Sequence, residues 1–120
     1  MTQTKEDLRK KLQSEQVELY SKWQLAADKS KILDALLMAL EETGKCSIVL
    51  KPATHKESKD RNTMINAYLP DEPTPFYWYL LETRGTASVA ETKRLLRRAK
   101  YATEELLKLS DDFTITIVEN

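Results

Sequence analysis

The residues with the most chemical content form a basic run, KRLLRRAK, at positions 93–100. On a helix with about 100° per residue, its five cations lie on one face together with an aromatic ring. Guanidinium groups bind phosphates bidentately, and an exposed tyrosine stacks readily on an unpaired base. The run therefore predicts a surface for RNA, single-stranded DNA or an acidic protein, while a plain solvated face explains it equally well. The residues of this predicted basic face are Lys93, Arg94, Arg97, Arg98, Lys100 and Tyr101.

A second group of cations lies in the polar stretch 52–62, PATHKESKDRN, which is predicted to be a surface loop. Lys56, Lys59 and Arg61 would help the basic face to hold an anionic partner. His55, the single histidine, lies beside them. Its simplest interpretation is a solvated loop residue, with contact to an anion as the alternative.

Side chains for catalysis or metal binding are few. One histidine and one cysteine, Cys46, exclude the paired ligand spacing of a zinc site. The neighbouring carboxylates Asp71/Glu72 and Asp111/Asp112 lie in predicted turns, where capping and solvation explain them better than Mg²⁺ does. We therefore expect a non-enzymatic protein without a metal or cofactor, and keep a small hydrolase using Asp111, Asp112 or His55 as a third, weaker hypothesis.

The elements that must position these residues begin with one very long helix. Neither proline nor glycine occurs from position 5 to position 43, and Gly44 is placed to end the helix in a left-handed conformation. A helix of about 39 residues would be on the order of 58 Å long, which exceeds the diameter of a compact domain of this size. We expect residues 5–28 to project as a helical arm from a globular α+β core at 29–120. The alternative is a break near Asp28 to Ser30, because aspartate and serine are good helix caps.

The arm carries an imperfect heptad repeat. Leucine or alanine recurs every seven residues at positions 12, 19, 26, 33 and 40. A coiled coil has a second apolar position in each heptad, and the two positions together form the seam between its helices. Trp23 and Leu37 occupy this second position, whereas Gln16 and Ser30 make it polar in two other heptads. The C-terminal half of the helix adds Ile32, Leu36 and Met38, which make its apolar face wide enough to lie on a sheet, so this half is interpreted as domain core. The N-terminal half predicts a homo-oligomer, a dimer in the simplest case, formed through helix 5–43 with oligomerisation contacts from Leu12, Leu19, Trp23 and Ala26.

Four segments have the pattern of strands. CSIVLK at 46–51 is predicted to end at Pro52, TMINAYL at 63–69 to be an edge strand, and FYWYLLE at 76–82 to be a central strand covered on both faces. An RNA-stacking platform is the alternative for the four aromatic residues at 76–79. FTITIVE at 113–119 alternates strictly and predicts a half-buried strand.

A second amphipathic helix precedes the last strand. Ser88 and Glu91 form a capping box, and an apolar stripe follows to about Leu109. That stripe consists of Leu95, Ala99, Ala102, Leu106 and Leu109. The predicted fold is α+β in the order α-β-β-β-α-β with a small mixed sheet of about four strands, the last one parallel to the third or near it.

Composition narrows the function classes. The 120 residues suit one domain, and nineteen basic residues balance nineteen acidic ones, so no global field favours nucleic acid or an anionic membrane. The polar residues 1–11 do not resemble a signal peptide, and no segment approaches the ~20 apolar residues of a membrane span. With a single cysteine, we expect a cytoplasmic protein without a membrane partner.

The element order between Ser30 and Leu109 is similar to that of a double-stranded RNA-binding domain, but the glycine-rich turn and the lysine cluster at a helix start are absent. The leading hypothesis is an oligomeric binding or regulatory protein, an inhibitor or adaptor of a viral or mobile-element type, that engages a macromolecular partner. Its alternative is a protein that binds RNA or single-stranded DNA through the basic face.

Overall fold

The computed structural model describes residues 5–54, 63–83 and 88–119, with the backbone alone at residues 5, 11–12, 14–20 and 54. The order of elements is α1 (Lys5–Thr43), β1 (Ser47–Thr54), β2 (Thr63–Tyr68), β3 (Tyr77–Glu82), α2 (Val89–Leu107) and β4 (Thr114–Ile117). This order confirms the α+β class, the long first helix and the four-stranded mixed sheet that the sequence predicts.

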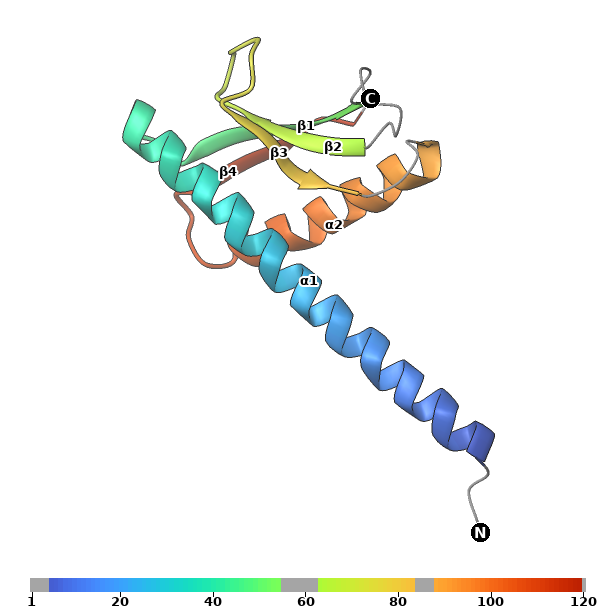
Figure 1. Ribbon diagram of the computed structural model, residues 1–120. Coiled ribbons are helices and arrows are strands. Elements are labelled where there is room, and N and C mark those ends of the chain that lie inside the picture. The colour runs from blue at the N-terminus through green and yellow to red at the C-terminus, as the bar shows by residue number, and fades with distance from the viewer. Residues whose placement is uncertain (1–4, 55–62, 84–87, 120) are drawn as a thin grey trace.

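Helix α1 is continuous through the predicted break point. Its N-terminal half projects away from the rest of the molecule, as Figure 1 shows. The molecule is correspondingly elongated, with extents of 62 × 39 × 19 Å and a radius of gyration of 17.5 Å. A compact domain of the same length would have a radius of gyration of about 14 Å. The helix already meets α2 at Gln24, Leu25 and Asp28, so its contact with the globular part begins before residue 29.

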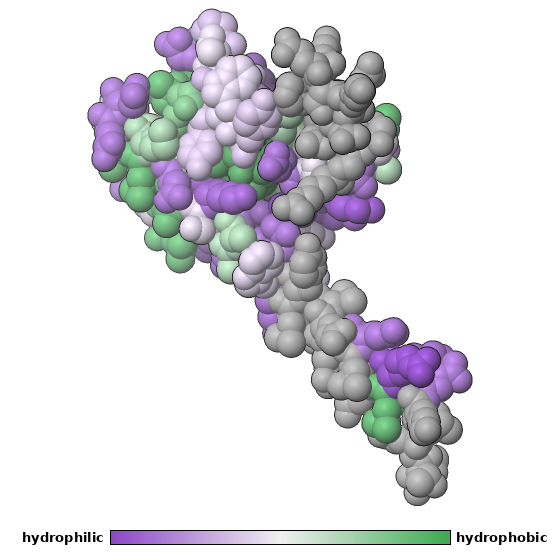
Figure 2. Space-filling model, viewed as in Figure 1, coloured by the Kyte–Doolittle hydropathy of each residue, from purple (hydrophilic) through white to green (hydrophobic). Residues whose placement is uncertain are grey.

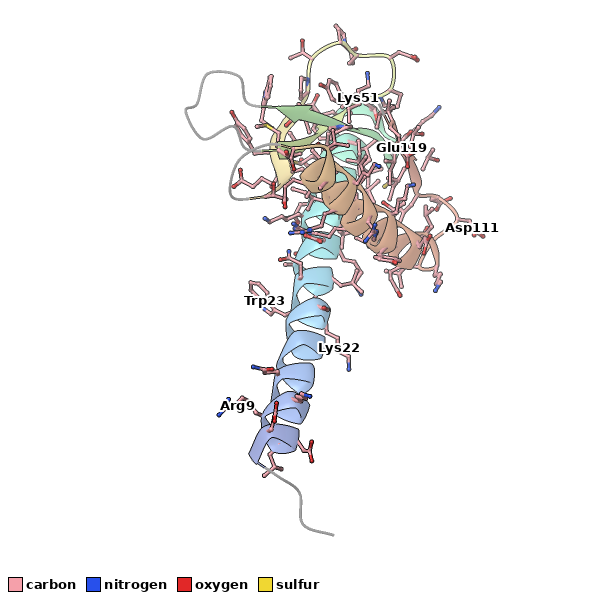
Figure 3. All side chains as sticks on the ribbon, turned by 90° about the vertical axis from the view of Figure 1, so that its right-hand side faces the viewer. Arg9, Lys22, Trp23, Lys51, Asp111 and Glu119 are labelled. Atoms are coloured by element: carbon pink, nitrogen blue, oxygen red, sulfur yellow. The ribbon has the colours of Figure 1, made fainter. Side chains whose placement is uncertain are left out.

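The sheet has the strand order β3-β2-β1-β4. Strands β1, β2 and β3 are antiparallel neighbours, and β4 is parallel to β1 with Ile48 opposite Ile115. Helix α2 therefore connects two edge strands that run in the same direction, with β2 and β1 between them. Both helices lie on one face of the sheet in Figure 1, which gives a two-layer fold. On the other face, where Figure 3 shows Lys51, the ammonium group of Lys51 lies 4.8 Å from the centre of the Tyr68 ring.

The core lies between the two helices and the sheet. Side chains spaced three and four apart supply it from each helix, while alternate residues supply it from β1 and β2 and the consecutive Leu80 and Leu81 supply it from the bulged β3. Most are completely buried leucine, isoleucine or alanine side chains. They include Ile32, Ala35, Leu36 and Ala39 of α1, Leu95, Ala99, Ala102 and Leu106 of α2, and Ile48, Leu50, Ile65, Ala67, Leu80 and Leu81 of the sheet.

Two strand assignments were wrong. The aromatic segment 76–82 supplies the edge strand β3 and not a central one, whereas β2 lies inside the sheet. The register between β2 and β3 shifts between Ile65 and Ala67, and Tyr79 has a φ of 55° within this bulge. Its backbone N–H donates to Oδ1 of Asn66 at 2.9 Å. The bulge turns Trp78 and Tyr79 outward, so both rings are exposed and the prediction that both faces are covered was also wrong.

Strand β1 and helix α2 end at other residues than the sequence predicts. Strand β1 continues through Pro52, because β4 ends opposite Leu50 and leaves β1 as an edge on that side, where proline is tolerated. Helix α2 ends at Leu107, and Leu109, expected in the buried stripe, is 72% exposed. The predicted caps are confirmed: Ser88 Oγ accepts from the Glu91 N–H at 3.1 Å, and Gly44 has a φ of 80°.

Candidate interaction surfaces

Most of the heptad repeat of α1 lies on the outside of the molecule where side chains are described, the half-buried Leu33 being the exception. Trp23 is 65% exposed, Leu37 48% and Leu40 42%, and Ala26 and Ser30 are also exposed. We call these five residues the heptad face. Figure 3 shows Trp23 projecting from one side of α1, below the globular part. In Figure 2 apolar residues are visible between charged ones on the side of the globular part along which α1 runs. The molecule therefore exposes a row of apolar side chains on this helix.

Helix α1 buries a different face. The residues that enter the core are Ile32, Ala35, Leu36 and Ala39, with Leu25 packed beside them. At about 100° per residue, the mean direction of this buried face lies roughly 140° from that of the heptad face. In heptad terms the core uses chiefly positions c and f, which point away from the seam formed by a and d. Helix α1 is consequently apolar on two nearly opposite sides, and the monomer covers only one of them.

The C-terminal half of α1 is domain core, as the sequence predicts, although Met38 is exposed. The heptad repeat contributes little to this core, because Ser30, Leu37 and Leu40 are exposed and only Leu33 packs partly against it. The sequence signal for the separation is the second stripe, with isoleucine, leucine or alanine at 32, 35, 36 and 39. For Leu12 and Leu19, which the sequence places in the same repeat, the structure describes only the backbone.

The basic face of α2 is not the cluster of free cations that the sequence suggests. Arg98 turns toward α1 and makes two hydrogen bonds to Asp28, from Nε to Oδ2 at 3.1 Å and from Nη2 to Oδ1 at 2.9 Å. Asp28 is 1% exposed, and its Oδ1 also accepts from Nε2 of Gln24 at 3.0 Å. A buried carboxylate needs such partners because an unpaired charge there costs several kcal/mol. Arg98 therefore holds the two helices together.

Two further cations of the basic run also have acidic neighbours. Arg94 forms an ion pair with Glu91 at 3.2 Å, and Lys100 forms one with Glu119 next to the last strand. Within the described residues, Lys93 and Arg97 are exposed and show no ion pair. Tyr101 is 57% exposed on the same helix. Lys56, Lys59, Arg61 and His55, the predicted second contribution, lie outside the described residues.

A groove of about 440 Å³ separates the arm from α2. Leu25, the aliphatic parts of Arg94 and Arg98, and the ring of Tyr101 give it a mostly apolar lining, while Glu104 and Glu105 add carboxylates. The groove lies on the side of α1 that carries Ser21, Gln24 and Asp28. It is thus separate from the heptad face.

Other site types find no support in the part of the chain described. At residues 5–54, 63–83 and 88–119, histidine, cysteine, aspartate and glutamate nowhere form a group of three able to hold a metal ion. Neither helix in these ranges combines the length and apolar character needed to cross a membrane. Comparison with known proteins gives no matching family model, no matching curated protein and no matching solved structure.

Proposed function

We propose that the protein is a non-enzymatic, homodimeric binding or regulatory protein that self-associates through the heptad face of α1 and engages a macromolecular partner with surfaces left outside the dimer. One observation supports this proposal: Trp23 and Ala26, two of the four residues predicted to form the oligomer, are exposed on the side of α1 away from the core, and Ser30, Leu37 and Leu40 of the same repeat are exposed there too. Apolar side chains exposed along one side of a helix, here interrupted by Ser30 and the half-buried Leu33, are typical of an interaction site.

The physical reason is the hydrophobic effect. Burying a leucine side chain that is otherwise exposed stabilises a complex by roughly 1.5–3 kcal/mol, and a second copy would bring Leu37 and Leu40 against the same residues. A twofold interface of this type is self-complementary, since each copy contributes the same patch. Association through positions a and d would leave the groove and the exposed face of α2 free for a partner.

Replacing Leu37 by glutamate tests the proposal. The wild-type chain is expected to have the mass of two 13.9 kDa copies by light scattering, whereas Leu37→Glu is expected to be a monomer because it places a charge in the seam. The matched control is Leu109→Glu, the same change at an exposed leucine outside α1, which should keep the mass of the wild type. Unchanged masses for all three proteins, or a monomeric wild type, would count against the proposal.

The alternative function is binding of RNA or single-stranded DNA through α2. It is supported by Lys93, Arg97 and Tyr101, which are exposed on one helix. With Lys93 and Arg97 as the contributing cations, affinity for a short single strand would fall with a slope of about −0.7 per phosphate contact in a plot of log K against log salt.

Fluorescence anisotropy with a labelled single-stranded RNA measures this alternative. The double change Lys93→Ala/Arg97→Ala should weaken binding and flatten the salt slope, while Lys108→Ala, at the exposed C-cap of α2, should leave both nearly unchanged. Absence of a complex at low salt would remove the nucleic-acid alternative without affecting the dimer.

A further inference from the structure

We propose that the two copies of α1 run parallel and in register, so that Ser30 faces Ser30 and Leu40 faces Leu40 of the second copy. This inference rests on the proposed self-association and adds its geometry. The seven-residue spacing assigns the heptad positions: Trp23, Ser30 and Leu37 are a positions, and Ala26, Leu33 and Leu40 are d positions, all exposed except the half-buried Leu33. Leucine occupies d at 12, 19, 33 and 40, as in parallel two-stranded coiled coils.

Charges beside the seam favour the parallel arrangement. Lys29 is a g residue and Asp34 is the e residue of the next heptad, and these two positions of different copies meet in a parallel coiled coil. Lys29 is half-buried and Asp34 is exposed, and neither shows an ion pair with another described residue of its own chain. In the twofold-symmetric dimer, Lys29 of each copy would form an ion pair with Asp34 of the other copy, which gives two such pairs.

Ser30, a polar residue of the seam whose side chain is described, also favours the parallel arrangement. In a parallel, in-register dimer the Ser30 hydroxyl meets the Ser30 hydroxyl of the second copy, and each is both donor and acceptor. The antiparallel arrangement that overlaps the whole helix pairs Trp23 with Ala26 and puts Ser30 opposite residue 19, a leucine. It also moves Lys29 and Asp34 of different copies about 21 Å apart along the axis. A polar a residue that pairs only with itself is a known determinant of register.

The globular part is attached mainly to the side of α1 that points away from the seam, although Leu36 at g and Leu33 at d also pack against the core. Ile32 and Ala39 at c, with Asp28 and Ala35 at f, attach the sheet and α2 to the outward side of the helix. The two globular parts would therefore lie at the same end of the dimer, on opposite outer sides, and the two arms would extend together from the other end. The exposed face of α2 in each of the two copies would remain accessible to a partner.

Single-cysteine crosslinking tests the orientation in the full-length chain. In a Cys46→Ser background, Ser30→Cys or Leu40→Cys would be oxidised gently and analysed for covalent dimer. Parallel helices bring either pair of sulfurs within disulfide distance, and we expect most of the chain to crosslink. Antiparallel helices would separate the Ser30→Cys positions by about 16 Å and the Leu40→Cys positions by about 46 Å along the axis. Lys31→Cys, exposed on the same helix but outside the seam, is the control.

The mass of each variant under reducing conditions separates the possible failures. A dimeric mass with crosslinking at Ser30→Cys and Leu40→Cys but not at Lys31→Cys supports the parallel arrangement. A dimeric mass in which neither seam variant crosslinks faster than the control overturns the orientation and leaves self-association standing. A monomeric mass of the parent Cys46→Ser chain and of the wild type overturns both.

Discussion

The Asp28 carboxylate is nearly inaccessible to water, yet it lies midway along a helix that is otherwise charged and projecting. Its partners, Arg98 and Gln24, satisfy both oxygens. Such a bidentate pair has demanding geometry, so it fixes how α1 crosses α2 and in which direction the arm leaves the globular part. The same pairing explains why α1 does not break here: the oxygens that would cap a new helix are bound to a side chain of α2.

Removing Arg98 should therefore be costly. We expect Arg98→Ala to lower the free energy of unfolding by about 3–5 kcal/mol, because Asp28 would stay buried without its counter-charge. Urea denaturation followed by circular dichroism measures the loss. The neighbouring, exposed Arg97→Ala should change stability by no more than about 0.5 kcal/mol. The double change Asp28→Leu/Arg98→Met should recover most of the stability, and a double variant as unstable as Arg98→Ala would contradict this account.

Asn66 has a comparable role at the bulge of β3. Its side chain is 2% exposed and accepts the backbone N–H of Tyr79, whose φ is positive. We expect Asn66→Ala to cost about 1–3 kcal/mol in urea unfolding, since the bulge loses the acceptor that holds it. Glu82 is exposed on β3, and Glu82→Ala serves as the comparison. Equal stability of the two variants would show that the bulge does not depend on Asn66.

These residue contacts were beyond prediction from sequence. The cations at 93–100 could be placed on one helix, but whether a guanidinium meets solvent or a carboxylate depends on a residue seventy positions away. Asp28 was noticed as a possible cap because local hydrogen bonding is readable from sequence, whereas its tertiary partner is not. The bulge at Trp78 and Tyr79 likewise arises from pairing with β2.

At the scale of elements, local signals were reliable. Ser88 caps α2 and Gly44 ends α1 as their positions indicate, because both depend on neighbours within a few residues. The predicted strand order was not reliable, because four consecutive aromatic residues are compatible with a central strand and with a bulged edge strand. The assignment of edge and centre is set by which strands pair across the sheet, and periodicity does not encode that.

The end of α1 offers a direct check of this local control. Gly44 has a φ of 80°, and a Cβ added there would meet no atom within 4 Å. Gly44→Ala should therefore destabilise the fold through backbone strain alone, by about 1 kcal/mol. Gly44→Asn should cost less, because asparagine tolerates the left-handed conformation better. Thermal unfolding of both variants gives the comparison, and an alanine variant as stable as the wild type would show that this turn adapts without strain.

At the scale of the whole molecule, two apolar stripes lie on one helix, and only one of them is buried among the described residues. Ile32, Ala35, Leu36 and Ala39 form the stripe that builds the core, and the heptad face remains exposed. Sequence reasoning found the repeat and correctly assigned the C-terminal half of the helix to the core, but it did not separate the two stripes, because apolar residues of both lie in the same segment. Only the placement of the sheet against positions c and f separates the two.

The parallel dimer also predicts the effect of reversing the charges at Lys29 and Asp34. If Lys29 and Asp34 pair across the interface, Asp34→Lys should weaken self-association by placing like charges at both ends of each pair. Adding Lys29→Asp should restore it, since the double variant has the reversed pair. Dissociation constants from dilution experiments at low salt measure this, and failure of the double variant to associate better than Asp34→Lys would argue against the pair.

The most direct test of the central claim is sedimentation equilibrium of the wild-type chain across the micromolar range. If the heptad face of α1 holds two copies together, the fitted mass will be that of two 13.9 kDa chains and will fall toward one on dilution. A mass of one chain at every concentration would contradict the account.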